Sequence, residues 1–183
     1  MSEFKPAFTY TMTWEDSNPS GEVTQDAGGR TRFGIAEVFN KDMPGDFWTA
    51  PTAQAILMAQ SQYKRNYFDV HHLDLILNQE VCSYVFDCIV NPGASFIKQI
   101  QQSAVYVSGV QLVQDGIIGA KTLGAINDCA VVKLLSLIAS HRKDHYQVNS
   151  SAVDLNGLYR RAEGWQLLVN SSSSIVSDPE IGM

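Results

Sequence analysis

Apolar residues recur at helical spacing through most of this 183-residue chain, and this periodicity constrains the fold more than any other feature. The expected helices cover residues 4–15, 53–67, 81–89, 94–107, 131–147 and 154–169. One convincing β signal interrupts them, because the flanks "EVT" and "RTRFGI" can pair as a short hairpin between residues 22 and 35. The pattern therefore predicts a mainly α fold of the α+β type, a helical bundle with one small β-hairpin.

The chain is long enough for one domain with an ordinary hydrophobic core. Its residues are 45% hydrophobic and 17% charged, which is typical of a globular protein. The sequence contains no internal repeat and no linker that divides it cleanly, so we expect a single domain over residues 1–170. Apolar content falls from the serine run at 171–174 onward, which predicts a loose tail over residues 171–183.

Charge and hydropathy exclude several classes of partner. The net charge of -6 and a pI near 5.1 argue against nucleic acid, whose binding requires a basic surface. The most apolar run, "AVVKLLSLIAS" at 130–140, is too short to span a membrane, so no membrane insertion is expected. The start of the chain lacks the basic and apolar regions of a secretory signal, which indicates a protein made in the cytoplasm.

Glu15 is the strongest candidate for a catalytic residue. It lies on the last turn of the first expected helix, beside the apolar side chains of Met12 and Trp14. The negative end of the helix dipole and a desolvating environment both favour a protonated carboxyl group. A carboxylic acid that keeps its proton near neutral pH is what glycoside hydrolysis requires as a general acid.

A second group of polar residues follows Glu15 in the expected hairpin. Asp26 lies 11 residues further on and Thr31 lies 16 further on, with Gly28 and Gly29 between them. A second carboxylate can activate water or stabilise positive charge on the sugar, and a threonine hydroxyl can hold that water. Two glycines allow a turn to approach a bulky sugar chain closely. Glu22 is an alternative second carboxylate.

Two other constellations are weaker. His141 and His145 are four residues apart, but Arg142 stands where a zinc-protease motif needs glutamate and no third ligand is indicated. The three cysteines, Cys82, Cys88 and Cys129, show no disulfide spacing and indicate free thiols. We therefore expect no metal site and no cofactor.

Residues 26–35 read "D-x-G-G-x-T-x-x-G-I" after a helix that ends in glutamate, and this pattern is similar to the N-acetylmuramidases of glycoside hydrolase family 108. Four later segments resemble elements of that family in the same order, so the resemblance spans about residues 4–169. These segments are "YKRNYFD" at 63–69, "FDCIVNPG" at 86–93, "VQDGIIGAKTLGAI" at 113–126 and "EGWQLL" at 163–168.

The resemblance implies a lysozyme-like fold with the hairpin at the active site. It implies cleavage of the β-1,4 bond between N-acetylmuramic acid and N-acetylglucosamine, with peptidoglycan glycan strands as the partner of a monomeric enzyme. The implied catalytic residues are Glu15 as general acid, Asp26 and Thr31. The implied substrate-binding residues are Gly28, Gly29, Tyr63, Tyr67 and Asn91. The implied setting is a phage endolysin, or a bacterial secretion-linked muramidase, that reaches the wall through a separate pore former.

The resemblance also divides the expected domain into a catalytic part, about residues 1–110, and a helical part, about residues 111–170. The helical part resembles a peptidoglycan-binding unit, although a scaffolding role is the favoured interpretation. Two other functions remain open. Glu15-Asp16-Ser17 stands where the family has Glu-Gly-Gly, which suggests a catalytically inactive peptidoglycan-binding protein as one alternative. A related hydrolase of chitin or chitosan is the other.

Overall fold

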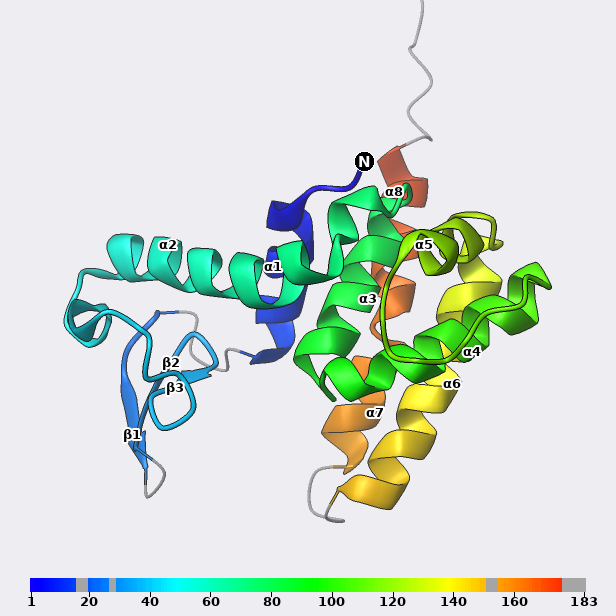
Figure 1. Cartoon of the computed structure of the whole chain (residues 1–183). Coiled ribbons are helices and arrows are strands. Elements are labelled where there is room, and N and C mark those ends of the chain that lie inside the picture. Colours follow the sequence, from blue (N-terminus) through cyan, green and yellow to red (C-terminus); the bar gives the residue numbers. More distant parts are fainter. Residues whose placement is uncertain (16–19, 27–28, 151–154, 176–183) are drawn as a thin grey trace, which may run out of the picture.

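The computed structural model describes residues 1–15, 20–26, 29–150 and 155–175 of the chain, and it confirms the mainly helical fold (Figure 1). A small antiparallel sheet accompanies the helices. The α-helices are α1 (Phe4–Glu15), α2 (Thr52–Tyr63), α3 (Gln79–Val90), α4 (Ile97–Ser108), α5 (Ala120–Asn127), α6 (Val131–Asn149), α7 (Leu155–Glu163) and α8 (Trp165–Ile175). Short 3-10 segments precede α2 and α4 at Gly45–Trp48 and Ala94–Phe96.

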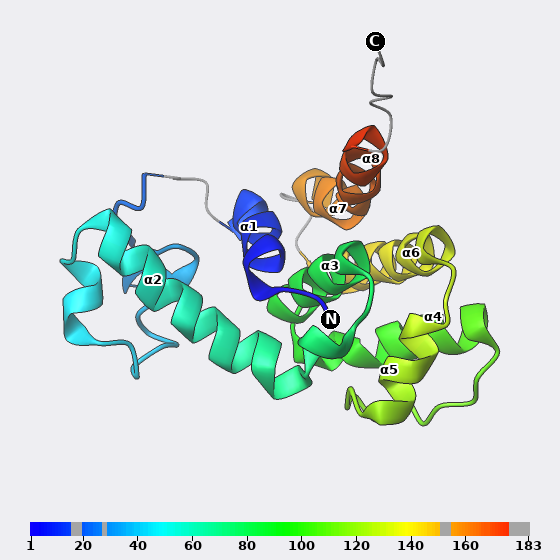
Figure 2. The same cartoon turned by 90° about the horizontal axis from the view of Figure 1, so that it is seen from above.

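Helix α3 is the centre of the core. Every residue from Val81 to Ile89 is buried, as expected for a helix that other elements cover on all sides. It contacts α1, α4, α6 and α8, and Figure 2 shows these helices around it. The sheet and the outer end of α2 lie on the opposite side of α1 from α4, α5 and α6 (Figure 1). Helix α1 therefore connects the part of the molecule that carries the sheet to the larger helical part.

The predicted hairpin is part of a three-stranded sheet with the order β1-β2-β3. Strands β1 (Thr24–Asp26) and β2 (Gly29–Arg32) pair as expected, but the segment "RTRFGI" is not one strand. It turns back at Phe33 and Gly34 into β3 (Ile35–Ala36). Both turn residues have positive φ, 50° and 71°, which is the backbone of the tight primed turn that connects twisted strands.

Two expected helices end differently in the structure. The helix expected over residues 53–67 ends at Tyr63 and continues as a π-helical turn, η2 (Lys64–Phe68). The helix expected over residues 154–169 is divided into α7 and α8 at Gly164. A Cβ atom on Gly164 would lie 2.5 Å from Cζ2 of Trp14 and 2.6 Å from the hydroxyl of Tyr10, so only glycine lets α1 approach this closely.

The loose tail was expected to begin at residue 171, but a helix extends beyond that residue. Helix α8 continues to Ile175, so residues 171–175 are helical, and residues 176–183 lie outside the described part of the chain. Leu168 and Val169 of α8 pack against the core, which gives this helix a reason to form. Among the described helices, no single one is long and apolar enough to cross a membrane; α5 and α6, bent by 116° at their junction, meet that test only as a pair.

The motif "DGIIGAKT" surrounds a buried glutamine of α4. The side-chain amide of Gln101 donates to Asp115 Oδ1 at 2.9 Å, to the Ile117 carbonyl at 3.0 Å and to Thr122 Oγ1 at 3.2 Å. In return its carbonyl oxygen accepts the backbone N–H of Gly116 at 2.9 Å. Gln101 is only 1% exposed, so these contacts satisfy a buried polar group and fix the turn before α5. These hydrogen bonds give the motif a structural role in the fold.

Candidate functional site

Glu15 ends α1 at the edge of a cavity of about 510 Å³. Its side chain is 19% exposed, and Oε1 lies 2.7 Å from Nη1 of Arg161 on α7. The cavity joins the end of α1 to the end of α3 and to one face of α7. It is lined by Thr13, Trp14, Glu15, Asn91, Gly157, Leu158, Arg160 and Arg161. The carboxyl group of Glu15 is thus largely buried, at the wall of a space that a sugar unit could enter.

Arg161 joins Glu15 to a second carboxylate in the core. Its Nη2 donates to Asp87 Oδ1 at 2.6 Å and its Nε donates to Oδ2 at 3.2 Å. Arg142 of α6 donates to the same Oδ2 from Nη1 at 2.7 Å. Asp87 and Arg142 are fully buried and the Arg161 side chain is 6% exposed. Two carboxylates and two guanidinium groups therefore form a charge-balanced network, which a buried ion of either sign requires.

The network continues to the end of α3. Arg142 donates to the backbone carbonyl of Asn91 and, through Nε, to the Tyr146 hydroxyl at 2.7 Å. The Tyr146 hydroxyl donates in turn to Asn91 Oδ1 at 2.9 Å. Burial raises the pKa of Tyr146 to about 12, so the phenol stays a donor at neutral pH. Asn91, a predicted substrate-binding residue, lines the cavity, and its side chain is fixed by the hydrogen bond from Tyr146.

The charges of the network act on Arg161 in opposite directions. Burial lowers the pKa of Arg161, but the carboxylates of Asp87 and Glu15 more than offset that effect and raise it above its usual value. The guanidinium is therefore a permanent positive charge beside Glu15. This is a polar environment for Glu15, whereas the sequence alone indicated an apolar one.

The turn between β2 and β3 lies against the other side of Glu15. A Cβ atom on Gly34 would lie 3.1 Å from Cβ of Glu15, 3.4 Å from Oε2 of Glu15 and 2.7 Å from the hydroxyl of Tyr63. Tyr63 is 4% exposed and donates to the Phe33 carbonyl at 3.2 Å. The ring of Tyr67 lies 5.6 Å from that of Tyr63, and burial, followed by the charge of Glu15, raises the pKa of Tyr67.

These contacts give the two predicted tyrosines different positions. Tyr63 is a core residue whose hydroxyl anchors the β2–β3 turn. Any effect of Tyr63 on substrate binding is therefore indirect, through the position of that turn. Tyr67 is half-buried on η2, and the charge of Glu15 contributes to the rise in its pKa. A substrate contact by Tyr67 stays a prediction that its position allows.

Gly34→Ala is expected to destabilise the turn and displace Glu15. The substitution places a methyl group into the space between Tyr63 and Glu15 at a backbone φ of 71°, which costs on the order of 1–2 kcal/mol before any clash is counted. Thermal melting should show a lower melting temperature. Gly45→Ala is the matched control, because nothing lies within 4 Å of a Cβ atom there. Equal melting temperatures for both variants would contradict this account of the turn.

The remaining predicted residues lie in the sheet. The backbone of Asp26 pairs with Gly29 where β1 and β2 meet, whereas the Asp26 side chain and Gly28 lie outside the described part of the structure. Thr31 is half-buried in β2, on the face opposite Arg30 and Arg32, because successive side chains of a strand alternate. The catalytic roles of Asp26 and Thr31 therefore stay predictions.

The arginines flanking Thr31 organise the opposite face of the sheet. Arg32 is 5% exposed and donates to the backbone carbonyls of Gly21 at 2.7 Å and Phe47 at 2.6 Å. Arg30 pairs with Glu37 at 2.6 Å and lies over the ring of Trp48. Contacts within the protein therefore occupy this face of the sheet, and the side chain of Thr31 lies on the other face.

Sequence reasoning missed Asp87, Arg142 and Arg161. Asp87 stands alone among apolar residues in "SYVFDCIV", and a carboxylate at such a position requires a buried cationic partner. That signal was available. The identity of the partners was not, because Arg161 is 74 residues from Asp87 in the chain and Arg142 is 55 residues from it.

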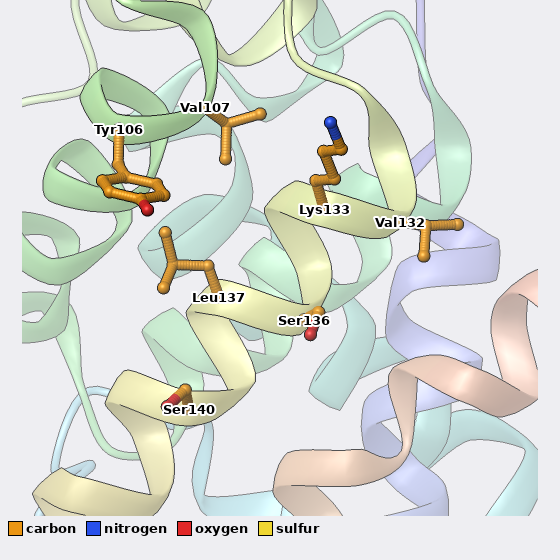
Figure 3. A pocket seen from close by; sticks show the side chains of 7 residues that line it. All are labelled: Tyr106, Val107, Val132, Lys133, Ser136, Leu137 and Ser140. Carbon is orange, nitrogen blue, oxygen red and sulfur yellow. The ribbon is translucent and has the colours of Figure 1, made fainter.

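A second pocket, of about 470 Å³, lies between α4 and α6 (Figure 3). Its lining residues are Tyr106, Val107, Val132, Lys133, Ser136, Leu137 and Ser140. These seven side chains include no carboxylate, so the pocket cannot supply a general acid of the kind that Glu15 offers. The cysteines offer no alternative nucleophile either, since burial raises the pKa of Cys82 and of Cys88 to about 12.

Part of the chain is similar to a known protein family. Residues 8–93 match the family model of glycosyl hydrolase 108. The matched segment covers most of α1, the sheet, α2 and α3, and it contains Glu15 and Asp87. Arg142 and Arg161 lie beyond the matched segment.

A solved structure is similar along almost the whole chain. The structure of Brucella abortus SagA covers 97% of this chain with 97% of its own, at a TM-score of 0.65 and 20% sequence identity. At this identity the likeness shows a shared fold, and it includes the helices that follow residue 93. A search of curated proteins gives no match to this sequence.

Proposed function

We propose that this protein is a peptidoglycan hydrolase that cleaves the β-1,4 bond between N-acetylmuramic acid and N-acetylglucosamine, with Glu15 as the general acid. The observation that carries the proposal is the position of Glu15. Its carboxyl group stands at the wall of a cavity of about 510 Å³, within the segment that matches a glycoside hydrolase family. The resemblance of residues 26–35 to the muramidases of that family supports the choice of substrate.

In the proposed reaction Glu15 donates its proton to the oxygen of the bond that breaks. The bond electrons move to that oxygen, and positive charge develops on the sugar ring. Asp26 stabilises that charge or activates a water molecule, which Thr31 helps to hold.

Purified cell walls provide the first test. The protein should clear a wall suspension and release fragments whose new reducing ends are N-acetylmuramic acid, which mass spectrometry after borohydride reduction identifies. Sedimentation with the walls without clearing would favour an inactive binding protein instead. Release of ends from chitin or chitosan but not from peptidoglycan would favour the alternative hydrolase.

Asp26→Asn, Thr31→Ala and Glu22→Gln should separate the two candidates for the second carboxylate. We expect Asp26→Asn to lower turnover about 100-fold, as is typical of the loss of a general base. Thr31→Ala removes one hydrogen bond and should cost about 10-fold. Glu22 is the other candidate, and because it is exposed we expect Glu22→Gln to retain the activity of the parent.

These effects should fall on turnover more than on substrate binding, because both residues act on charge and water that matter chiefly in the transition state. Lytic rates and melting temperatures of the three variants decide the assignment. An inactive Glu22→Gln variant beside a fully active Asp26→Asn variant would assign the second carboxylate to Glu22 and contradict the role given to Asp26.

A further inference from the structure

We propose that Arg161 is the positioning residue for Glu15, so that α7 completes the active site from outside the segment that matches the hydrolase family. This inference rests on the proposed function. Glu15 is the last residue of α1, where a helix no longer restrains its side chain through a following turn. A general acid must nevertheless be held in one orientation toward the bond that it protonates. Arg161 supplies that restraint.

The guanidinium group of Arg161 binds two carboxylates at once. Nη1 lies 2.7 Å from Glu15 Oε1, while Nη2 and Nε approach the two oxygens of Asp87 at 2.6 and 3.2 Å. The guanidinium is planar, so a bidentate contact with one carboxylate fixes the plane of the group and the position of its remaining nitrogen, which forms an ion pair with Glu15. The position of Asp87 therefore determines the position of the group that holds Glu15.

Asp87 is a rigid base for this arrangement. It is fully buried in α3, the central helix, and a second guanidinium, that of Arg142, holds it from α6. Arg161 is itself only 6% exposed on its side chain, so little space is left for another orientation. The restraint on Glu15 thus runs from α3 and α6 through α7 to the end of α1.

The geometry also distinguishes the two oxygens of Glu15. Oε1 faces Arg161, whereas Oε2 lies on the side of the β2–β3 turn, 3.4 Å from the position of a Cβ atom on Gly34. A proton on Oε1 would point at a positive charge. Arg161 therefore contacts one oxygen of Glu15 and leaves the other on the side of the turn.

Removal of Arg161 takes away the group that joins Glu15 to Asp87. Asp87 keeps Arg142 as a partner, whereas Glu15 loses this ion pair. The loss should therefore act on catalysis through the orientation of Glu15.

The test compares Arg161→Met and Arg161→Lys with the parent on soluble glycan strands, by release of reducing ends. Arg161→Met should lower kcat at least 10-fold with KM changed less than 3-fold. Arg161→Lys keeps the charge but not the planar guanidinium, so it should restore only part of the kcat that Arg161→Met loses. Carboxyl NMR should show the loss of the ion pair as a displaced Glu15 signal in Arg161→Met, independently of activity.

Lys143→Met is the matched control, because Lys143 pairs with Glu163 and so also links α6 to α7 through one positive charge. It should leave kcat as in the parent. Parental kcat in Arg161→Met, with only a lower melting temperature, would overturn the inference and leave a structural role. If Arg161→Met does not fold, Arg161→Lys decides, and parental kcat in that variant overturns it. A parent that releases no muramic acid ends refutes the proposed function instead, and the Glu15 carboxyl signal still reports whether Arg161 contacts Glu15.

Discussion

Replacing Glu15 with glutamine is expected to lower the rate of wall lysis by about 100- to 10,000-fold, the range that the loss of a general acid produces. Glutamine has nearly the shape of glutamate, but its amide has no acidic proton for the glycosidic oxygen. Its side chain can still lie beside Arg161, so we expect the fold and the Arg161–Asp87 pair to survive. Lysis of purified walls and thermal melting should be measured on the same preparations.

Glu3→Gln is the control for this experiment. Glu3 is an exposed residue next to the first turn of α1, at the opposite end of the helix from Glu15, so the same change in charge is made far from the cavity. The control should keep the activity of the parent. Lytic activity of Glu15→Gln within a few-fold of the parent, at an unchanged melting temperature, would remove Glu15 from the mechanism.

The parts of the fold that the sequence predicts well are those that local pattern determines. Helix α1 was expected over residues 4–15 and is found at Phe4–Glu15, because its apolar residues repeat at helical spacing and a segment rich in turn residues follows. The same reasoning places Glu15 at a helix end, which is the property that made it a candidate. The family resemblance of residues 26–35 added the chemistry that periodicity cannot supply.

The parts that the sequence did not predict depend on contacts between distant residues. The hairpin pattern did not reveal β3, because the reversal at Phe33 requires a positive φ at a non-glycine residue, and a turn packed against Glu15 and Tyr63 supports it. The break at Gly164 reflects the close approach of α1 rather than any local signal. In the sequence, Arg161 is one more cation on an amphipathic helix. Only the fold shows that it lies between two carboxylates.

A chain shortened to about residues 1–110 is expected to be insoluble or molten, although the matched family segment ends at residue 93. The shortened chain lacks α6 and α8, which cover α3, and lacks Arg142 and Arg161, which hold Asp87. Either α3 exposes its apolar faces to water or Asp87 stays buried without a cation, and removing one partner of a buried ion pair alone costs about 3–5 kcal/mol. That is a large part of the 5–15 kcal/mol that stabilises a typical domain.

Near-UV circular dichroism, dye binding and gel filtration should show this loss of packing, with the full chain as the control. Lysis should be lost as well, because the shortened chain has no Arg161 to hold Glu15. A shortened chain that melts cooperatively and clears cell walls would show that the two parts are independent modules. That outcome would leave the helices after residue 110 free for a separate binding role, whereas the shared network of Glu15, Arg161, Asp87 and Arg142 predicts that catalysis and folding both require them.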